Sequence, residues 1–341
     1  MNQLVLFLLA AFVFVSSPSL ALADEALPTQ DLTVQRLADA LYEPGYRDFL
    51  ATRDRLRLIV EEGPRDQAAA AAAVLQVYAE NADRWLLKVG NTENAQRWLG
   101  LDLPLGQGRI RGKRTNFDFA ANLWIKVQEQ TPTREMAYLY SYTPVDTVTI
   151  TGKTIKDAHL RYLSGLSKLR LLEISDTTVS GSFLANADLP NLEFLHIVNS
   201  PVQDSSIPTT VLRRLSTADF QGTLIGNEIL QRLSMERIAV LKVSNTAVDA
   251  EGVMLLESAD QLMSISLDAD DLTPAVVEML SKKESVIRIH IAFRRQQKEL
   301  AAKLASRFPP RIKIVTHDIA DEDYYLTRWN TPTTTKNDQC E

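Results

Sequence analysis

The chain has 341 residues, which is long enough for a large buried core and for more than one domain. Its 37 Lys and Arg residues stand against 43 Asp and Glu, a net charge of -6 that argues against a nucleic-acid-binding protein. Cys340 is the only cysteine, so no disulfide can form within the chain.

The N-terminus carries an uninterrupted apolar run over residues 4–15, followed by Ala21-Leu22-Ala23 directly before Asp24. An apolar run of this length followed by an A-x-A pattern is typical of a secretory signal peptide, although no Lys or Arg precedes the run here. We therefore predict that residues 1–23 are a signal peptide and that the protein is exported, to the periplasm or beyond the cell. The alternative is an uncleaved segment that anchors the chain in a membrane.

Residues 24–143 are expected to form an α-helical N-terminal domain without repeats. Apolar residues at helical spacing predict helices over 34–41, over 47–61 and from about Asp66 onward. Phe117, Phe119, Leu123, Trp124 and Val127 predict one more helix, which ends before Thr131. We expect this domain to cover the first strand of the repeats that follow.

A regular repeat begins at Val145 and is clearest over residues 169–179, LRLLEISDTTV. Counted from its first apolar position, a unit has apolar residues at offsets 0, 3, 5 and 10 and most often a hydroxyl at offset 8. The units start at 145, 169, 192, 215, 238, 262 and 286, which are 23 or 24 residues apart. A fixed period in this range predicts a stack of similar structural units.

The repeats resemble the leucine-rich repeat family over about residues 144–320. The similarity extends to a bacterial type with a T-x-V-[TS]-D-x-G-L-like turn, seen in degenerate form over residues 154–160 and 246–253. This resemblance implies an α/β solenoid, with parallel strands on the concave side and helices on the convex side. Residues 321–341 are then a C-terminal tail that covers the far end.

Alternate side chains of each expected strand point away from the core, so offsets 2 and 4 form rows along the concave face. The centre of these rows supplies our candidate binding residues: Leu171, Glu173, Phe194, His196, Asp219, Val240 and Lys242. A second, basic group is expected at the C-terminal end, with His317 outside the rows: Arg288, His290, Arg311 and Lys313.

His196 falls between Glu173 and Asp219, an arrangement that invites a catalytic or metal-binding interpretation. A metal site needs three or more convergent ligands, however, and a row of opposite charges is also common on an ordinary solvated sheet. The sequence has no GxSxG, HExxH, CxxC or P-loop motif. We therefore expect no catalytic residue, no metal and no cofactor.

These patterns together predict an exported, non-catalytic protein that binds a protein or another envelope macromolecule on its concave face. Nucleic acid is not an expected partner, and a membrane is one only if the N-terminal segment stays uncleaved. Two alternatives remain open. One is an envelope enzyme whose active site lies in the helical domain or where that domain meets the first repeat, and the other is a structural protein that packs laterally in the envelope.

Overall fold

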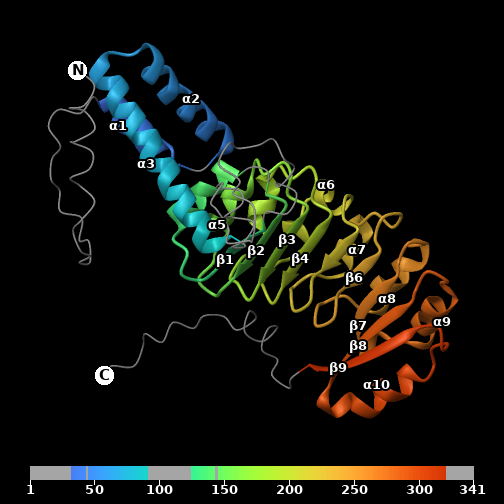
Figure 1. Cartoon of the computed structure of the whole chain (residues 1–341). Helices are drawn as coiled ribbons and strands as arrows, with labels where there is room; N and C mark the ends of the chain where they lie inside the picture. Colours follow the sequence, from blue (N-terminus) through green and yellow to red (C-terminus); the bar gives the residue numbers. More distant parts are fainter. Residues whose placement is uncertain (1–31, 44, 91–123, 143–144, 320–341) are drawn as a thin grey trace, which may run out of the picture.

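The computed structural model describes residues 32–43, 45–90, 124–142 and 145–319 (Figure 1). The expected signal peptide, the C-terminal tail and Cys340 lie outside this part of the chain. Within it, no helix combines the length and the apolar character that crossing a membrane requires.

The described residues form one parallel sheet with helices, so the chain has an α/β fold, as expected. The nine strands lie side by side in sequence order, and the sheet does not close on itself (Figure 1). Their bounds are β1 Trp124–Val127, β2 Thr147–Thr151, β3 Leu171–Ser175, β4 Phe194–Val198, β5 Thr217–Asp219, β6 Val240–Lys242, β7 Ser264–Asp268, β8 Arg288–Arg294 and β9 Lys313–Ile319.

The strands pair in the register that the repeat predicts for most of the sheet. Leu172 lies beside Leu195, and Ile174 lies beside Ile197. Offset 3 thereby becomes a continuous row of side chains without solvent exposure across seven strands: Val148, Leu172, Leu195, Ala218, Leu241, Ile265 and Ile289. Burying this row stabilises the sheet because each apolar side chain is removed from water by its neighbours in the adjacent units.

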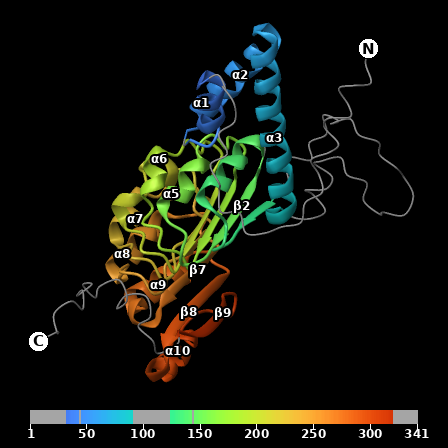
Figure 2. The same cartoon turned by 90° about the vertical axis from the view of Figure 1, so that its left-hand side faces the viewer.

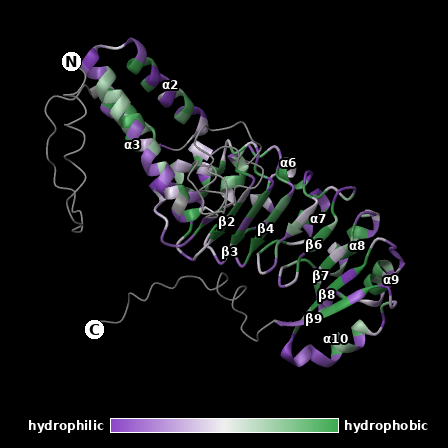
Figure 3. Ribbon diagram, in the orientation of Figure 1, coloured by the Kyte–Doolittle hydropathy of each residue, from purple (hydrophilic) through white to green (hydrophobic). Residues whose placement is uncertain are grey.

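Short helical segments connect the strands and cover one face of the sheet (Figure 2). Hydrophobic residues run through the strands, and hydrophilic residues gather on the connecting turns (Figure 3). The segments are α5 Asp157–Leu160, η4 Arg161–Leu163, η5 Ser182–Asn186, η6 Asp204–Ser206, α6 Thr209–Leu212, α7 Asn227–Arg232, α8 Ala250–Met254, η7 Leu255–Ser258, η8 Ala269–Asp271, α9 Pro274–Lys282, η9 Arg295–Gln297 and α10 Lys298–Ala305. We call the opposite face of the sheet the open face.

The hydroxyls at offset 8 hold the turns, as their position in the repeat predicts. Thr177 and Ser200 share a hydrogen bond of 2.8 Å between their side-chain oxygens, and both residues are buried. The hydroxyls of Thr223 and Thr246 each donate 2.6 Å bonds to the carbonyl three residues earlier. These bonds satisfy backbone groups that burial would otherwise leave unpaired.

Aspartates in one unit cap the helix of the next unit. The N-cap position of α7 is Gly226, which has no side chain, and Asp204 accepts hydrogen bonds from Gly226 N at 2.9 Å and from Ile229 N at 3.0 Å. Asp157 accepts in the same way from Ser180 N at 2.8 Å and from Phe183 N at 3.3 Å. The sheet register and the helix starts are therefore coupled between neighbouring units.

The N-terminal helices agree with prediction; they pack on one another, and α3 contacts the first strand of the sheet. They are α1 Leu32–Ala40, α2 Tyr46–Glu62 and α3 Arg65–Val89. A 3-10 segment, η3 Thr133–Tyr142, lies against α3 and contributes to a cluster of aromatic rings. Within it, Tyr78 OH donates a 2.8 Å bond to Ala137 O, and burial raises the Tyr78 pKa.

The prediction of a helix that ends before Thr131 is wrong over Trp124–Val127, where the structure has the strand β1; Phe117, Phe119 and Leu123 lie outside the described residues. Ile125 and Val127 are fully buried while Trp124 and Lys126 are exposed, a period of two that suits a strand. The free edge of β2 supplies the hydrogen-bonding partner for this segment. Helix α3 packs against β1, so β1 lies between the N-terminal helices and the first strand of the repeats, β2.

Candidate binding surface

The structure brings all seven candidate residues together on the open face of β3 to β6. Strand pairing places Leu171, Phe194 and Val240 in one row, with Thr217 between the last two. The neighbouring row contains the four polar candidates in the predicted order: Glu173, His196, Asp219 and Lys242. We call the seven predicted residues the central patch.

The four polar residues of the central patch form two adjacent pairs. His196 Nδ1 lies 3.3 Å from Glu173 Oε1, and Lys242 Nζ lies 2.7 Å from Asp219 Oδ2. Asp219 is buried, whereas Glu173 and Lys242 are each partly accessible. The Nε2 atom of His196 is buried and has no hydrogen-bond partner among the described residues. A buried polar atom without a hydrogen-bond partner costs free energy.

The apolar residues of the central patch remain half-buried on a face that no described helix covers. Leu171, Phe194 and Val240 each retain partial exposure. The guanidinium of Arg170 lies 5.7 Å from the centre of the Phe194 ring and also pairs with Glu193 at 2.9 Å. An aromatic ring flanked by a cation and bordered by aliphatic groups is a surface suited to contact with another macromolecule.

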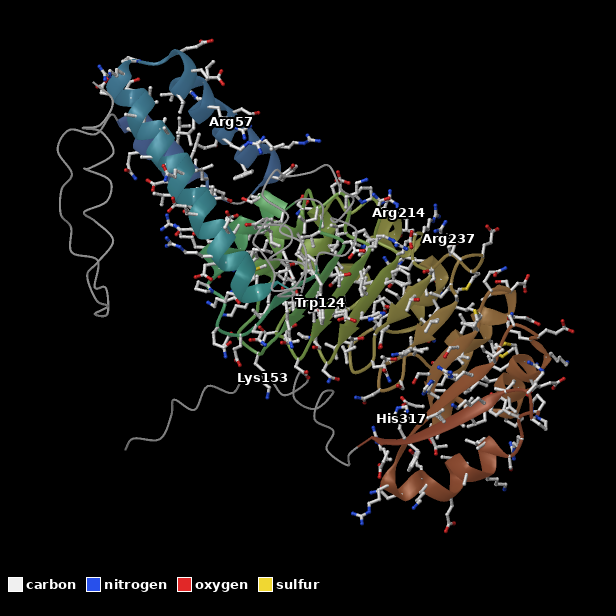
Figure 4. All side chains as sticks on the ribbon, viewed as in Figure 1. Arg57, Trp124, Lys153, Arg214, Arg237 and His317 are labelled. Atoms are coloured by element: carbon white, nitrogen blue, oxygen red, sulfur yellow. The ribbon has the colours of Figure 1, made fainter. Side chains whose placement is uncertain are left out.

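Trp124 lies in line with Thr147 and Leu171 of the apolar row, and its indole reaches across to the polar row. It was missed because the sequence pattern placed it in a helix. Its Nε1 donates a 2.8 Å hydrogen bond to Thr149 Oγ1, whose hydroxyl donates at 2.8 Å to Glu173 Oε2. The Trp124 side chain lies at the β1 end of the sheet and is 41% exposed (Figure 4). Glu173 is thus held from both sides, by Thr149 and by His196.

The predicted rows place Lys313 beside His290, but the last strand pairs two residues out of that register. Lys313 pairs with Arg288, and Val315 rather than Lys313 lies beside His290. Arg311 precedes β9, and its guanidinium donates to backbone carbonyls of the α9 to β8 connection, including Val286 O at 2.9 Å. It therefore holds a loop and does not belong to the surface row.

The same shift brings His317 onto the open face, contrary to prediction. Its ring centre lies 6.4 Å from that of His290 in an edge-to-face arrangement. Arg288 and Lys313 are exposed, and the two histidines are partly buried. We call Arg288, His290, Lys313 and His317 the basic patch; His317 marks its position at the end of the sheet opposite Trp124 (Figure 4).

A cavity of about 180 Å³ lies where β7 and β8 end. Its lining is mostly polar: Asn245, Thr246, Val248, Asp268, Asp270, Asp271, Arg294 and Gln297. Burial raises the pKa of Asp268 to about 6, although a hydrogen bond from Asn245 N opposes the rise. Burial, with the neighbouring carboxylates, also raises the pKa of Asp271 to about 7. These residues are a pH-sensitive cluster that the repeat pattern gave no reason to expect.

The chain matches no protein-family model, and no curated protein is similar to it in sequence. Among the described residues, no three His, Cys, Asp or Glu side chains are grouped so that they could hold a metal ion. The function of the chain is therefore inferred from the geometry of the open face.

Proposed function

We propose that the chain is an exported leucine-rich repeat solenoid that binds a protein partner on its open, concave face and carries out no catalysis. The observation that carries this proposal is the central patch. It combines Phe194 and Leu171, both half-buried, with fixed charges on the neighbouring row, on the face that helices α5 to α9 do not cover.

The solenoid assignment is supported by the agreement between the sequence period and the strand pairing. Each strand from β2 to β7 pairs with the next at a step of 23 or 24 residues, as between Leu171 and Phe194. The export proposal depends on residues 1–23 and is tested by the mass of the protein from its own cells. A mature chain that began at Met1 would contradict it.

The geometry favours recognition because the polar groups are already oriented. Glu173 is fixed by Thr149 and His196, and Asp219 is fixed by Lys242. A surface whose charges are held before binding loses little conformational entropy on association. The apolar row can then supply contact area while the charged row sets the orientation of the partner.

The first prediction concerns two apolar side chains. Replacing Leu171 and Phe194 together by Ala should reduce partner retention at least about tenfold, because both contribute exposed apolar area at the centre of the patch. The measurement is quantitative affinity capture by residues 24–341 from envelope extract of its own source.

The matched control replaces Leu58 and Val77, which are 49% and 54% exposed on α2 and α3, by Ala. It removes similar apolar area far from the sheet and should retain the partner. Equal retention by the wild-type chain and by Leu171→Ala/Phe194→Ala would refute the placement of the site. Circular dichroism and thermal unfolding establish that each variant folds.

A further inference from the structure

The basic patch is a concentration of positive charge on a chain of opposite overall sign. The chain carries a net charge of -6, yet β8 and β9 place the exposed Arg288 and Lys313 next to each other on the open face. His290 and His317 follow on the same face, with ring centres 6.4 Å apart. Four cationic or protonatable side chains thus occupy two neighbouring strands.

We propose that the basic patch binds an acidic segment of the protein partner and that protonation of His290 and His317 strengthens this binding. The inference rests on the proposed function and adds the chemistry of the partner. It is argued from charge complementarity, because carboxylates of a partner would meet Arg288 and Lys313 directly.

An acidic polypeptide fits this face better than other polyanions. The basic patch continues across β7 into the central patch, which supplies Val240 and Phe194 as apolar neighbours. A peptide can present carboxylates and apolar side chains together. The net negative charge of the chain disfavours an extended nucleic acid or an anionic membrane surface, both of which need a larger basic surface.

The surroundings of the two histidines explain the dependence on pH. Burial lowers the pKa of His290, and the nearby His317, Arg288, Lys242 and Lys313 lower it further. Burial and then Lys242 lower the pKa of His317. Both rings are therefore largely neutral near pH 7 in the free protein, and an anion bound beside them would favour their charged forms.

The other charged groups near this site belong to four strands. Lys242 on β6 is already paired with Asp219 on β5, and Arg294 lies at the end of β8. Asp268 on β7 pairs with Ala292 on β8, which in turn pairs with His317 on β9. Burial raises the pKa of Asp268 to about 6. Acidification therefore removes negative charge at Asp268 while it adds positive charge at the histidines, and a test must separate the two.

The test uses a fluorescein-labelled peptide that alternates Glu with Leu and a matched peptide with Gln in place of Glu. Binding to the full mature chain is measured by fluorescence anisotropy at about pH 5.5 and about pH 7.5, where the Glu side chains stay ionised. We expect the Glu peptide to bind about tenfold tighter at the lower pH, and the Gln peptide to bind weakly at both.

Three variants assign the effect to residues. Arg288→Gln/Lys313→Gln should weaken Glu-peptide binding about tenfold at both pH values. His290→Gln/His317→Gln should keep the affinity seen at the higher pH and lose the increase at the lower one. Arg237→Gln, a control at an exposed position before β6, should behave as the wild-type chain does.

Four results would overturn the proposal. The first is equal binding of the Glu and Gln peptides, and the second is binding of inorganic polyphosphate without binding of the Glu peptide. The third is a pH response that survives in His290→Gln/His317→Gln and disappears in Asp268→Asn. The fourth is binding that appears only after Asp321, Glu322 and Asp323 are neutralised, which would make the chain's own tail the occupant.

These results are distinguishable from a failure of the proposed function. The Arg288→Gln/Lys313→Gln variant leaves Leu171 and Phe194 in place, three or more strands away. If this variant still captures the partner as well as the wild-type chain does, the acidic-segment proposal is overturned while the central patch keeps its role. If Leu171→Ala/Phe194→Ala also captures normally, the proposed function is lost as well.

Discussion

Asp268 shows how a single residue of this fold couples burial to protonation. Its Oδ2 accepts a 2.9 Å hydrogen bond from Asn245 N, whereas its Oδ1 is buried without a hydrogen-bond partner in the described structure. Burial raises its pKa to about 6. Between about pH 4 and about pH 6, the folded protein therefore keeps a proton on this carboxyl that the unfolded chain has released. Stability therefore falls as the pH rises from about 4 to about 6, and the loss persists above that window.

Replacing Asp268 by Asn should relieve this loss. The amide keeps an acceptor for Asn245 N and removes the desolvated charge, so we expect the variant to be about 1–2 kcal/mol more stable than the wild-type chain near pH 8. Near pH 4 the two should differ little, because the wild-type carboxyl is then protonated in the folded state and no charge has to be buried. Urea unfolding at the two pH values is the measurement.

The exposed Asp188, changed to Asn, serves as the control and should have a small effect at both pH values. A stabilisation by Asp268→Asn that was equal at pH 4 and pH 8 would show that the carboxyl charge is not its cause. Destabilisation at pH 8 would show that the buried charge is compensated by its surroundings.

Residues of the central patch could be predicted from the sequence because the period assigns each a position in the sheet. Glu173, His196 and Asp219 recur at offset 4, and strand pairing makes them neighbours. The hydrogen bond from Thr149 to Glu173 follows the same rule. His317 could not be placed in this way, because its position depends on how many residues the preceding helix and loop consume.

At the scale of the element, the helical segments η5 and α7 depend on caps supplied from the preceding unit. The α7 helix begins after Gly226, which cannot cap it, and Asp204 binds the amides of Gly226 and Ile229 instead. In the equivalent contact of Asp157, burial alone would raise the pKa, but hydrogen bonds from the Ser180 and Phe183 amides hold it below its ordinary value. A carboxylate is thus the favoured state at such a cap.

Substituting Asp204 by Ala should destabilise the protein by about 1–2 kcal/mol, because two backbone amides lose their acceptor at once. Chemical denaturation measures the difference. Asp204→Asn keeps one acceptor oxygen and should cost clearly less than the Ala variant. If both variants unfold at the wild-type denaturant concentration, the contact between units does not contribute to stability.

Strands β1 and β9 differ from prediction, because the sequence pattern gives only part of the information that determines their structure. The segment Trp124–Val127 has strand alternation, but it is four residues long and lies outside the repeat, so its apolar residues also fit a helix. Strand β9 follows Pro309-Pro310, after the turn motif has been lost. Its register is set by pairing with β8, which extends over seven residues and aligns Ile314 with Ile289.

At the scale of the whole molecule, the sheet presents one continuous surface with chemically distinct parts. Trp124 and the central patch occupy β1 to β6, and the basic patch occupies β8 and β9. The aromatic cluster around Tyr78 and Tyr138 fixes the N-terminal helices to one end of this sheet. Extended surfaces of this kind are typical of stacked repeats, in which each unit adds one strand to the sheet.

The central claim is that a partner contacts the open face at Phe194. The most direct measurement places a photo-crosslinking phenylalanine analogue at position 194, or at Leu255 on the helix-covered side, and identifies the adducts formed in envelope extract by mass spectrometry. We expect one dominant adduct, with the partner, from position 194 and no adduct with that partner from position 255. An adduct with the partner from position 255 alone would contradict contact at Phe194. The absence of any adduct from position 194, while the chain still captures its partner, would contradict it as well.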